Sequence, residues 1–135
     1  MNVTGILNSF KRFFKRRQYQ RYYVKEGTLV VISPDNAKNL EQKVELIDIS
    51  RGGMAFIYKG SPSDIAASGL IKLLTKNQPY SKEGIPFGTV SDIPISGKIQ
   101  KSEQFRRRGV KFKWLGFYDE FALMYFINEV TICEK

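Results

Sequence analysis

Residues 44–58 read Val-Glu-Leu-Ile-Asp-Ile-Ser-Arg-Gly-Gly-Met-Ala-Phe-Ile-Tyr, two apolar runs on either side of a short turn sequence. The runs Val44 to Ile49 and Met54 to Tyr58 contain many residues with high β-propensity. Between them, Ser50-Arg-Gly-Gly53 has the small and polar residues that favour a turn. The stretch therefore predicts a strand, a turn and a second strand, arranged as an antiparallel hairpin.

Further strands are expected on both sides of this hairpin. Upstream, Tyr23 to Ile32 predicts one strand that ends at the turn sequence Ser33-Pro34-Asp35-Asn36. Downstream, three short apolar runs predict strands: Leu70 to Leu74, Ile85 to Val90 and Ile93 to Ile95. An irregular excursion is expected around Asn77 to Gly84, where polar and turn-forming residues gather.

The C-terminal third predicts one more hairpin and a helix. Residues 97–101 and 108–114 alternate polar and apolar residues, as an antiparallel hairpin would. One face of the expected helix carries Phe117, Phe121, Met124 and Ile127, and Asp119 and Glu120 fall in its first turn. Many short strands followed by one helix predict a mainly β fold, a small β-barrel plugged or flanked by that helix.

Composition limits the class of protein. The chain has 135 residues, 42% of them hydrophobic and 13% aromatic, which suits one folded domain with an ordinary core. No apolar run approaches the roughly 20 residues of a membrane-spanning helix, and the N-terminus lacks the pattern of a secretion signal. Cys133 is the only cysteine, so we expect a reducing, cytoplasmic setting.

The chain contains no histidine, which excludes His-based acid–base catalysis and most transition-metal sites. The only adjacent acids, Asp119 and Glu120, lie at the expected helix start, where the helix dipole favours negative charge. We therefore expect a binding module with no cofactor, and not an enzyme.

The net charge of +9 is concentrated at the N-terminus. The first 21 residues hold six basic residues and no acid, and the remaining 16 basic and 13 acidic residues leave only +3. Residues 1–15 also have apolar residues near helical spacing, which predicts a basic amphipathic helix. That helix either lies on an anionic membrane surface, peripheral to the inner membrane, or packs against the barrel or a partner chain.

Two short motifs define the candidate site. Arg17-Gln-Tyr-Gln-Arg21 offers two guanidinium forks, which suit phosphates and the O6/N7 edge of guanine. Asp48-Ile-Ser50-Arg-Gly-Gly53 offers a carboxylate that accepts from the N1–H and N2–H₂ donors of guanine, with a hydroxyl beside it. Gly52 and Gly53 permit positive φ, which would let the backbone approach a ligand closely.

Each motif also has an ordinary interpretation. Arg12-Phe-Phe-Lys-Arg16 repeats the four-residue spacing of Arg17 and Arg21, so the register of the arginine pair stays open. The Asp-x-Ser-x-x-Gly pattern by itself is most often a tight turn with a side-chain cap. The order and separation of the two motifs favour the functional interpretation.

At these residues the chain resembles the PilZ domain, the bacterial receptor module for cyclic di-GMP. That family pairs Arg-x-x-x-Arg on an N-terminal loop with (Asp/Asn)-x-Ser-x-x-Gly on a barrel, and all five core positions are present as Arg17, Arg21, Asp48, Ser50 and Gly53. The resemblance covers roughly residues 16–130. No counterpart is evident between Gly60 and Ser91, which indicates an insertion.

The resemblance implies a six-stranded antiparallel β-barrel with a C-terminal helix over residues 16–135. It also implies a cyclic di-GMP site in which Arg17 and Arg21 clamp phosphate and guanine, and Asp48, Ser50 and Gly53 contact the other face of the ligand. Arg16 extends the motif to Arg-Arg-x-x-x-Arg, which in the family is associated with two stacked ligand molecules.

Two other functions remain alternatives. A small barrel can bind single-stranded nucleic acid through basic patches and exposed aromatics, although here the charge gathers at one end instead of following a groove. A PilZ-like adaptor could instead contact an acidic protein surface and bind no nucleotide. Trp114 and the strand aromatics are expected in the core and not as a stacking platform.

Overall fold

The computed structural model of the chain describes residues 19–35, 40–74, 84–95 and 104–135. The described elements are β1 (Tyr22–Val24), β2 (Leu29–Pro34), β3 (Gln42–Ile49), β4 (Gly53–Lys59), the 3-10 helix η1 (Pro62–Asp64), β5 (Ser68–Leu73), β6 (Ile85–Pro94), β7 (Phe105–Phe112), α2 (Phe117–Val130) and β8 (Thr131–Glu134). The expected segment 1–15, with Arg16 and Arg17, lies outside the described residues.

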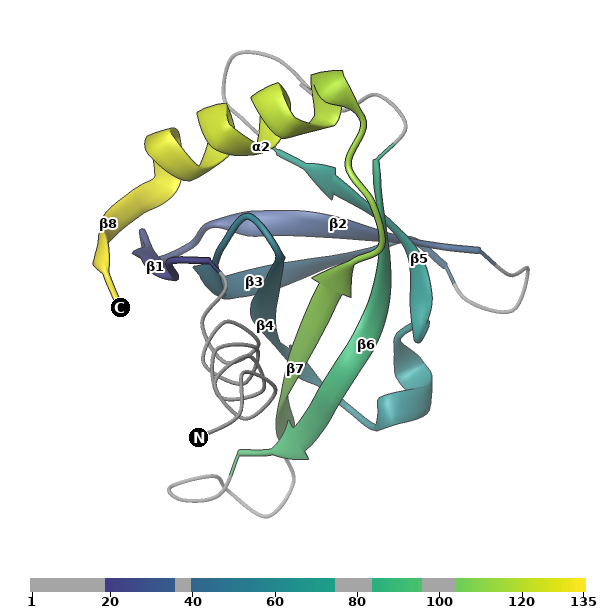
Figure 1. Ribbon diagram of the computed structural model, residues 1–135. Helices are drawn as coiled ribbons and strands as arrows, with labels where there is room; N and C mark the ends of the chain where they lie inside the picture. Colours follow the sequence, from purple (N-terminus) through teal and green to yellow (C-terminus); the bar gives the residue numbers. More distant parts are fainter. Residues whose placement is uncertain (1–18, 36–39, 75–83, 96–103) are drawn as a thin grey trace, which may run out of the picture.

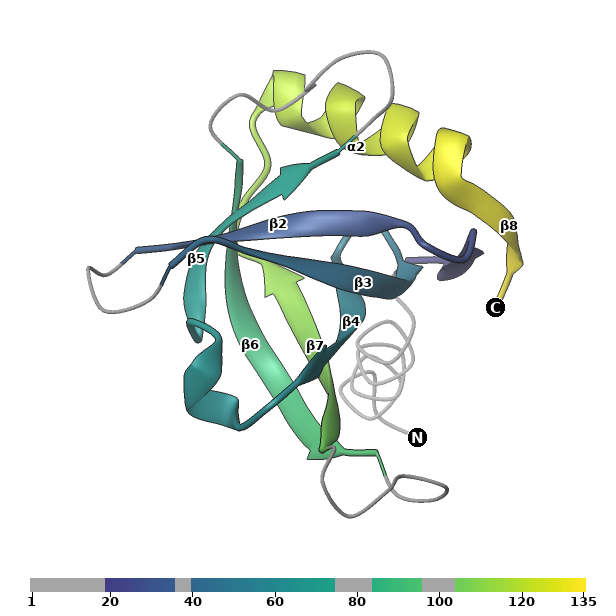
Figure 2. The same cartoon turned by 180° about the vertical axis from the view of Figure 1, so that it is seen from behind.

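Six strands form a closed antiparallel barrel. Their order is β2-β5-β6-β7-β4-β3, and the pairing of β2 with β3 closes the ring. β1 pairs with β3 outside this ring, and β8 pairs with β1. Figures 1 and 2 show α2 lying over the barrel, with β8 leading from its end back to β1. The expected six-stranded barrel with one C-terminal helix is confirmed.

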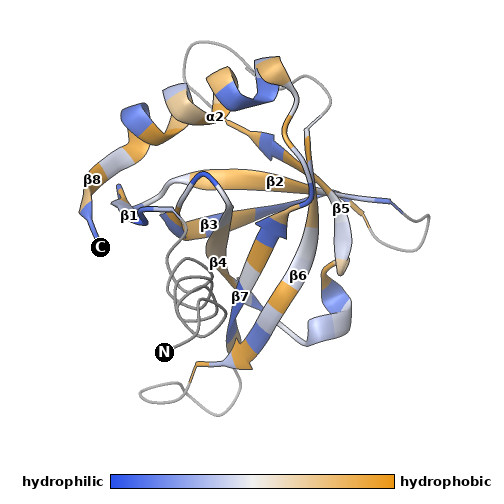
Figure 3. Cartoon of the chain, viewed as in Figure 1, coloured by the Kyte–Doolittle hydropathy of each residue, from blue (hydrophilic) through white to orange (hydrophobic). Residues whose placement is uncertain are grey.

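The barrel interior is filled by alternate residues of the strands. In β4 the inward residues are Met54, Phe56 and Tyr58, and in β7 they include Val110 and Phe112, all less than a tenth exposed. Figure 3 shows the corresponding alternation of apolar and polar residues along β6 and β7. This period of two leaves the intervening residues of the same strands on the outer face.

The single strand expected from Tyr23 to Ile32 is wrong, because the chain turns between β1 and β2. The backbone N–H and the hydroxyl of Thr28 both donate to the carbonyl of Lys25, at 3.2 and 2.6 Å, and Gly27 has a φ of +81°. Positive φ is accessible to glycine at no steric cost, so Gly27 allows this turn inside a run of β-forming residues.

The insertion expected between Gly60 and Ser91 is also wrong. β5 and most of β6 come from this stretch, and both are strands of the barrel. The runs Ile85 to Val90 and Ile93 to Ile95 were expected as separate strands, but β6 is one strand that contains the first run and continues to Pro94, with a register shift between Thr89 and Ser91. Residues 97–101, expected in a hairpin with residues 108–114, lie outside the described residues. Within the described part, β7 pairs with β6 and β4.

α2 begins where expected but buries a different face. Asp119 accepts a hydrogen bond from the N–H of Gly116 at 3.1 Å, which satisfies a free donor at the helix start. The buried residues are Ala122, Leu123, Phe126, Ile127 and Val130. Of the face expected from the sequence only Ile127 is buried, while Phe117, Phe121 and Met124 are exposed, as is Trp114.

No helix among the described residues has the length and apolar character needed to cross a membrane.

Candidate functional site

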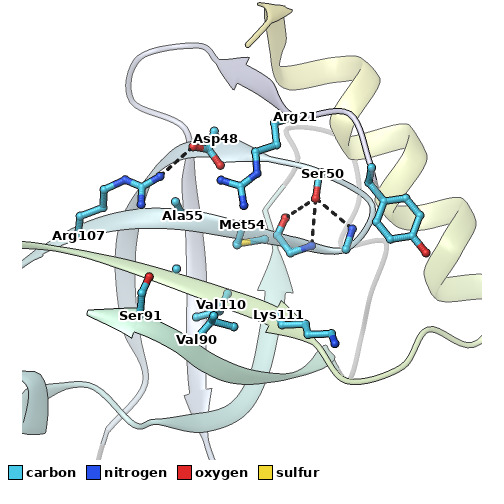
Figure 4. Close-up of a pocket in the computed structure, with 14 residues that line it drawn as sticks. Arg21, Asp48, Ser50, Met54, Ala55, Val90, Ser91, Arg107, Val110 and Lys111 are labelled. Carbon is cyan, nitrogen blue, oxygen red and sulfur yellow. Dashed lines mark hydrogen bonds and ion pairs between the residues drawn. The ribbon is translucent and has the colours of Figure 1, made fainter. Parts of the chain in front are cut away.

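A pocket of about 330 Å³ lies on the outer face of the barrel, over β3, β4, β6 and β7. Figure 4 shows the residues that line it. They are Tyr19, Arg21, Asp48, Ser50, Gly52, Gly53, Met54, Ala55, Val90, Ser91, Arg107, Gly109, Val110 and Lys111. The volume is at the lower end of the range of small-molecule sites.

Asp48 reaches the pocket because of a β-bulge in β3. Leu46 pairs with Phe56 but Asp48 pairs with Ala55, so Ile47 is an extra residue in the ladder. An extra residue reverses the alternation of a strand beyond it. Leu46 therefore faces the core and so does Ile49, whereas Asp48 turns to the outer face.

The Asp48 carboxylate is buried and paired with two cations. Asp48 is only 2% exposed. Its Oδ2 accepts a hydrogen bond from Arg107 Nη2 at 3.2 Å and another from Lys135 Nζ at 2.8 Å. Arg107 comes from β7, and Lys135 follows β8. A buried carboxylate needs such partners, because removing an unpaired charge from water is costly.

Ser50 organises the turn between β3 and β4. Its Oγ accepts from the backbone N–H of Gly52 at 3.1 Å and of Gly53 at 3.2 Å, and its own N–H donates to the carbonyl of Gly53 at 2.9 Å. The interpretation as a turn with a side-chain cap is therefore confirmed. The turn also places Ser50 in the wall of the pocket (Figure 4).

The expectation that Gly52 and Gly53 use positive φ is wrong, because neither residue has positive φ. What matters is the missing side chain. A Cβ on Gly53 would overlap the carbonyl oxygen of Val110, and a Cβ on Gly52 would come within 2.7 Å of the Tyr19 ring. Both glycines therefore permit close packing of the turn against its neighbours.

Three outward-facing residues of β7 that the sequence analysis missed also line the pocket, together with the buried Val110. Arg107, Gly109 and Lys111 occupy alternate positions on the outer face, while Arg108 and Val110 between them are buried. The alternation was visible in the sequence, but only the pairing of β7 with β4 and β6 places these residues beside Asp48. The register shift at Val90 brings Ser91 opposite Gly109 on the same face.

Arg21 enters the pocket from the segment before β1. Figure 4 shows its side chain between Asp48 and Ser50. With Arg107 and Lys111 it gives the pocket three basic residues against the single acid Asp48. Neither Arg21 nor Lys111 forms an ion pair with a residue that the structure describes. The net positive charge favours an anionic ligand, and Asp48 favours one that also donates hydrogen bonds.

Of the six site residues predicted from the sequence, Arg21, Asp48, Ser50 and Gly53 lie together in this pocket. Arg16 and Arg17 fall outside the described residues, as does Arg12, so the register of the arginine pair stays a prediction. Among the residues that the structure describes, no three carboxylates or cysteines gather as a metal site.

A second cluster of charged groups lies inside the barrel wall and has a structural role. Arg108, 2% exposed, donates from Nε to Asp92 at 2.8 Å and from Nη2 to the Pro62 carbonyl at 2.7 Å. Its Nη1 donates to the carbonyls of Ile65 and Ala66 at 3.1 and 2.9 Å. Arg108 thereby fastens the η1 connection to β7.

Asp92 is the centre of this second cluster. It also accepts hydrogen bonds from Tyr58 Oη and Arg106 Nε. Burial alone would raise the pKa of Asp92, but the hydrogen bonds from Tyr58, Arg106 and Arg108 outweigh it and hold the pKa below the ordinary 3.8. Burial and the bond to Asp92 raise the pKa of Tyr58 above 10.0. The charged groups of this cluster thus bind one another and nearby backbone carbonyls, which indicates a structural role.

Solved structures of two other proteins share the fold of this chain. The "PilZ domain with c-di-GMP of YcgR from Escherichia coli" aligns with a TM-score of 0.62 and 17% identity, over 85% of this chain and 91% of that chain. The K. pneumonia MrkH–c-di-GMP complex aligns with a TM-score of 0.64 and 16% identity, over 84% of this chain and 52% of that chain.

MrkH in its apo state aligns with a TM-score of 0.60 and 15% identity, over 82% of this chain and 47% of that chain. This chain thus spans about half the length of MrkH. No protein-family model and no curated protein matches the chain. At identities this low the likeness shows that the fold is PilZ-like.

Proposed function

We propose that the protein is a cyclic di-GMP receptor and acts through binding, without catalysis. The observation that carries the proposal is the meeting of Arg21, Asp48, Ser50 and Gly53 in one pocket, although Arg21 and Asp48 lie 27 positions apart in the sequence. Two of the similar structures, the YcgR domain and the MrkH complex, contain c-di-GMP. The fold and the pocket support the same ligand class.

Each site residue has a role that its chemistry suits. Arg21 donates its fork to a phosphate or to the O6/N7 edge of guanine. Asp48 accepts from the N1–H and N2–H₂ donors of a guanine base, which adenine does not offer. Ser50 and Gly53 shape the turn against which the ligand lies. Arg17 adds a second fork, and Arg16 a third that allows two ligand molecules to stack at one site.

The proposed output of binding is a movement of the N-terminal segment. Arg21 joins the pocket directly to residues 1–20, which include five further basic residues. A ligand held between Arg21 and the barrel would draw this segment onto the pocket and reposition residues 1–15. Those residues would then meet a target protein or a membrane surface in one state and not in the other.

Isothermal titration calorimetry tests the ligand. We expect the full chain to bind cyclic di-GMP, to bind cyclic di-AMP and GTP far more weakly, and to show no preference for a single-stranded oligonucleotide. Arg21→Ala should weaken binding by about 2–5 kcal/mol, because it removes one partner of a desolvated charge pair. Asp48→Ala should also weaken it.

A matched control is Arg51→Ala, which removes a guanidinium from the same turn but not from the residues that line the pocket. It should bind like the wild-type protein. Absence of cyclic di-GMP binding at tens of micromolar would refute the proposed function, and tight oligonucleotide binding would favour the nucleic-acid alternative.

A further inference from the structure

Arg107 lies between the buried Asp48 and the open pocket. Its side chain is 29% exposed, whereas that of Asp48 is 2% exposed. One Nη of its guanidinium donates to Asp48 at 3.2 Å, a longer contact than the 2.8 Å bond from Lys135 to the same oxygen. Figure 4 shows Arg107 reaching Asp48 from the far wall of the pocket, opposite the approach of Arg21.

The side chains of the two cations on Asp48 are similarly exposed, 32% for Lys135 and 29% for Arg107, but only Arg107 lines the pocket. The backbone N–H of Lys135 donates to the carbonyl of Arg21 at 3.0 Å, and its ammonium lies 5.6 Å from the centre of the Tyr23 ring. Because Lys135 stays on Asp48, departure of Arg107 would not leave that buried carboxylate without a partner. Loss of the last partner would be strongly unfavourable, so this arrangement makes Arg107 the cation that can be exchanged.

We propose that Arg107 is a further ligand-binding residue. On ligand binding, its guanidinium moves away from Asp48 and binds a phosphate of the nucleotide instead. The guanine N1–H and N2–H₂ donors then take the place of Arg107 on Asp48. Every buried charge keeps a partner through this exchange: Asp48 exchanges one donor for another, and Arg107 exchanges a carboxylate for a phosphate. The inference rests on the proposed function and assigns a residue outside both sequence motifs.

The outer face of β7 carries a second polar group near Arg107. The next outward residue is Gly109, where a Cβ would come within 2.8 Å of Ser91 Oγ, so the Ser91 hydroxyl lies over the glycine. Both Arg107 and Ser91 line the pocket, where a ligand can contact them together. An arginine suits the exchange better than a lysine, because its planar fork forms two parallel bonds to a phosphate.

The exchange also predicts selectivity. A ligand must bring an anion for Arg107 and hydrogen-bond donors for Asp48 at the same time. Adenine presents an acceptor where guanine presents N1–H, so cyclic di-AMP would leave Arg107 on Asp48. Selectivity for guanine would then come from the pair Asp48–Arg107 and not from Asp48 alone.

Calorimetry with cyclic di-GMP and the full chain tests the proposal. Arg107→Met should weaken binding about 30-fold or more, and Arg107→Lys about 10-fold, because lysine keeps the charge but loses the fork. The matched control is Lys113→Met, which removes a charge from an exposed residue after β7 that does not line the pocket, and it should change affinity by less than about threefold.

The Asp48→Asn background separates contact with the ligand from support of Asp48. If Arg107 binds phosphate, Arg107→Met weakens binding further in that background; if it merely holds Asp48, the second change has no effect and the inference is overturned. Thermal denaturation of each variant confirms the fold, with Arg107→Lys as the variant that retains a cation beside Asp48. Wild-type protein that fails to bind cyclic di-GMP would refute the proposed function itself, whereas binding unaffected by Arg107→Met would overturn only this inference.

Discussion

Gly53 begins β4 at a point where the strand passes very close to β7. A side chain there would overlap the backbone carbonyl of Val110, which is held in the ladder between β4 and β7. We expect Gly53→Ala to lower the free energy of unfolding by about 1–3 kcal/mol, because one of the two strands must shift. Urea denaturation would measure the loss.

The matched control for Gly53→Ala is Gly88→Ala in β6. A Cβ at Gly88 would meet only the end of the Lys113 side chain, at 3.6 Å, and its φ is not positive. This change should alter the free energy of unfolding by less than about 0.5 kcal/mol. Equal losses at the two glycines would contradict the close approach at Gly53.

Asp92 makes the fold sensitive to acid. Its folded pKa lies below 3.8, so its ionised form stabilises the fold above the unfolded pKa of about 4, and this contribution is lost as the pH falls through the folded value. We expect the free energy of unfolding to fall between pH 4 and pH 2, measured by urea denaturation at each pH, and Asp92→Asn to flatten this slope while lowering stability at pH 7.

Glu26→Gln serves as the control for Asp92→Asn, because Glu26 is an exposed acid in the turn after β1. If the free energy of unfolding of Asp92→Asn falls as steeply between pH 4 and pH 2 as that of the wild-type protein, other carboxylates govern acid unfolding.

α2 gives the sharpest test at the scale of one element. Phe126 is fully buried against the barrel, whereas Phe121, five positions earlier, is 63% exposed. Phe126→Ala should lower the free energy of unfolding by about 3–5 kcal/mol, because it opens a cavity, while Phe121→Ala should change it by no more than about 0.5 kcal/mol. Chemical denaturation of the two variants would check this, and the reverse order would mean that the helix buries its other face.

The sequence could predict the strands that flank a recognisable turn. β3 and β4 were expected correctly because two runs of β-forming apolar residues lie on either side of the turn at residues 50–53. The same reasoning failed at β1 and β2, where β-forming residues continue across the turn at Gly27. In α2, apolar residues occur on nearly every side, so helical spacing did not identify which side meets the barrel.

The site was predicted only where it lies within a short motif. Asp48, Ser50 and Gly53 are close together in the sequence, so their spacing could be recognised. Arg107 was not identified, because its place beside Asp48 depends on the order of β3, β4 and β7 in the barrel. The bulges at Ile47 and Val90 reverse the faces of two strands, and no residue pattern announces them.

At the scale of the whole molecule, the pocket is connected to both ends of the described chain. β1 pairs with β3, which carries Asp48, and with β8, which follows α2 directly. The backbone N–H of Lys135 donates to Arg21, and its ammonium binds Asp48. A ligand that contacts Arg21 and Asp48 would therefore contact residues that are linked both to the N-terminal segment and to the end of β8.

Hydrogen exchange would show whether binding orders the N-terminal segment. We expect amides of residues 1–21 to exchange more slowly when cyclic di-GMP is bound, because Arg17 and Arg21 would hold this stretch against the pocket. Amides of β2 and β5, on the barrel side remote from the pocket residues, serve as the internal reference and should change little. Arg21→Ala with the same concentration of ligand should show no added protection. Unchanged exchange over residues 1–21 in wild-type protein saturated with ligand would refute the proposed movement and leave the binding site intact.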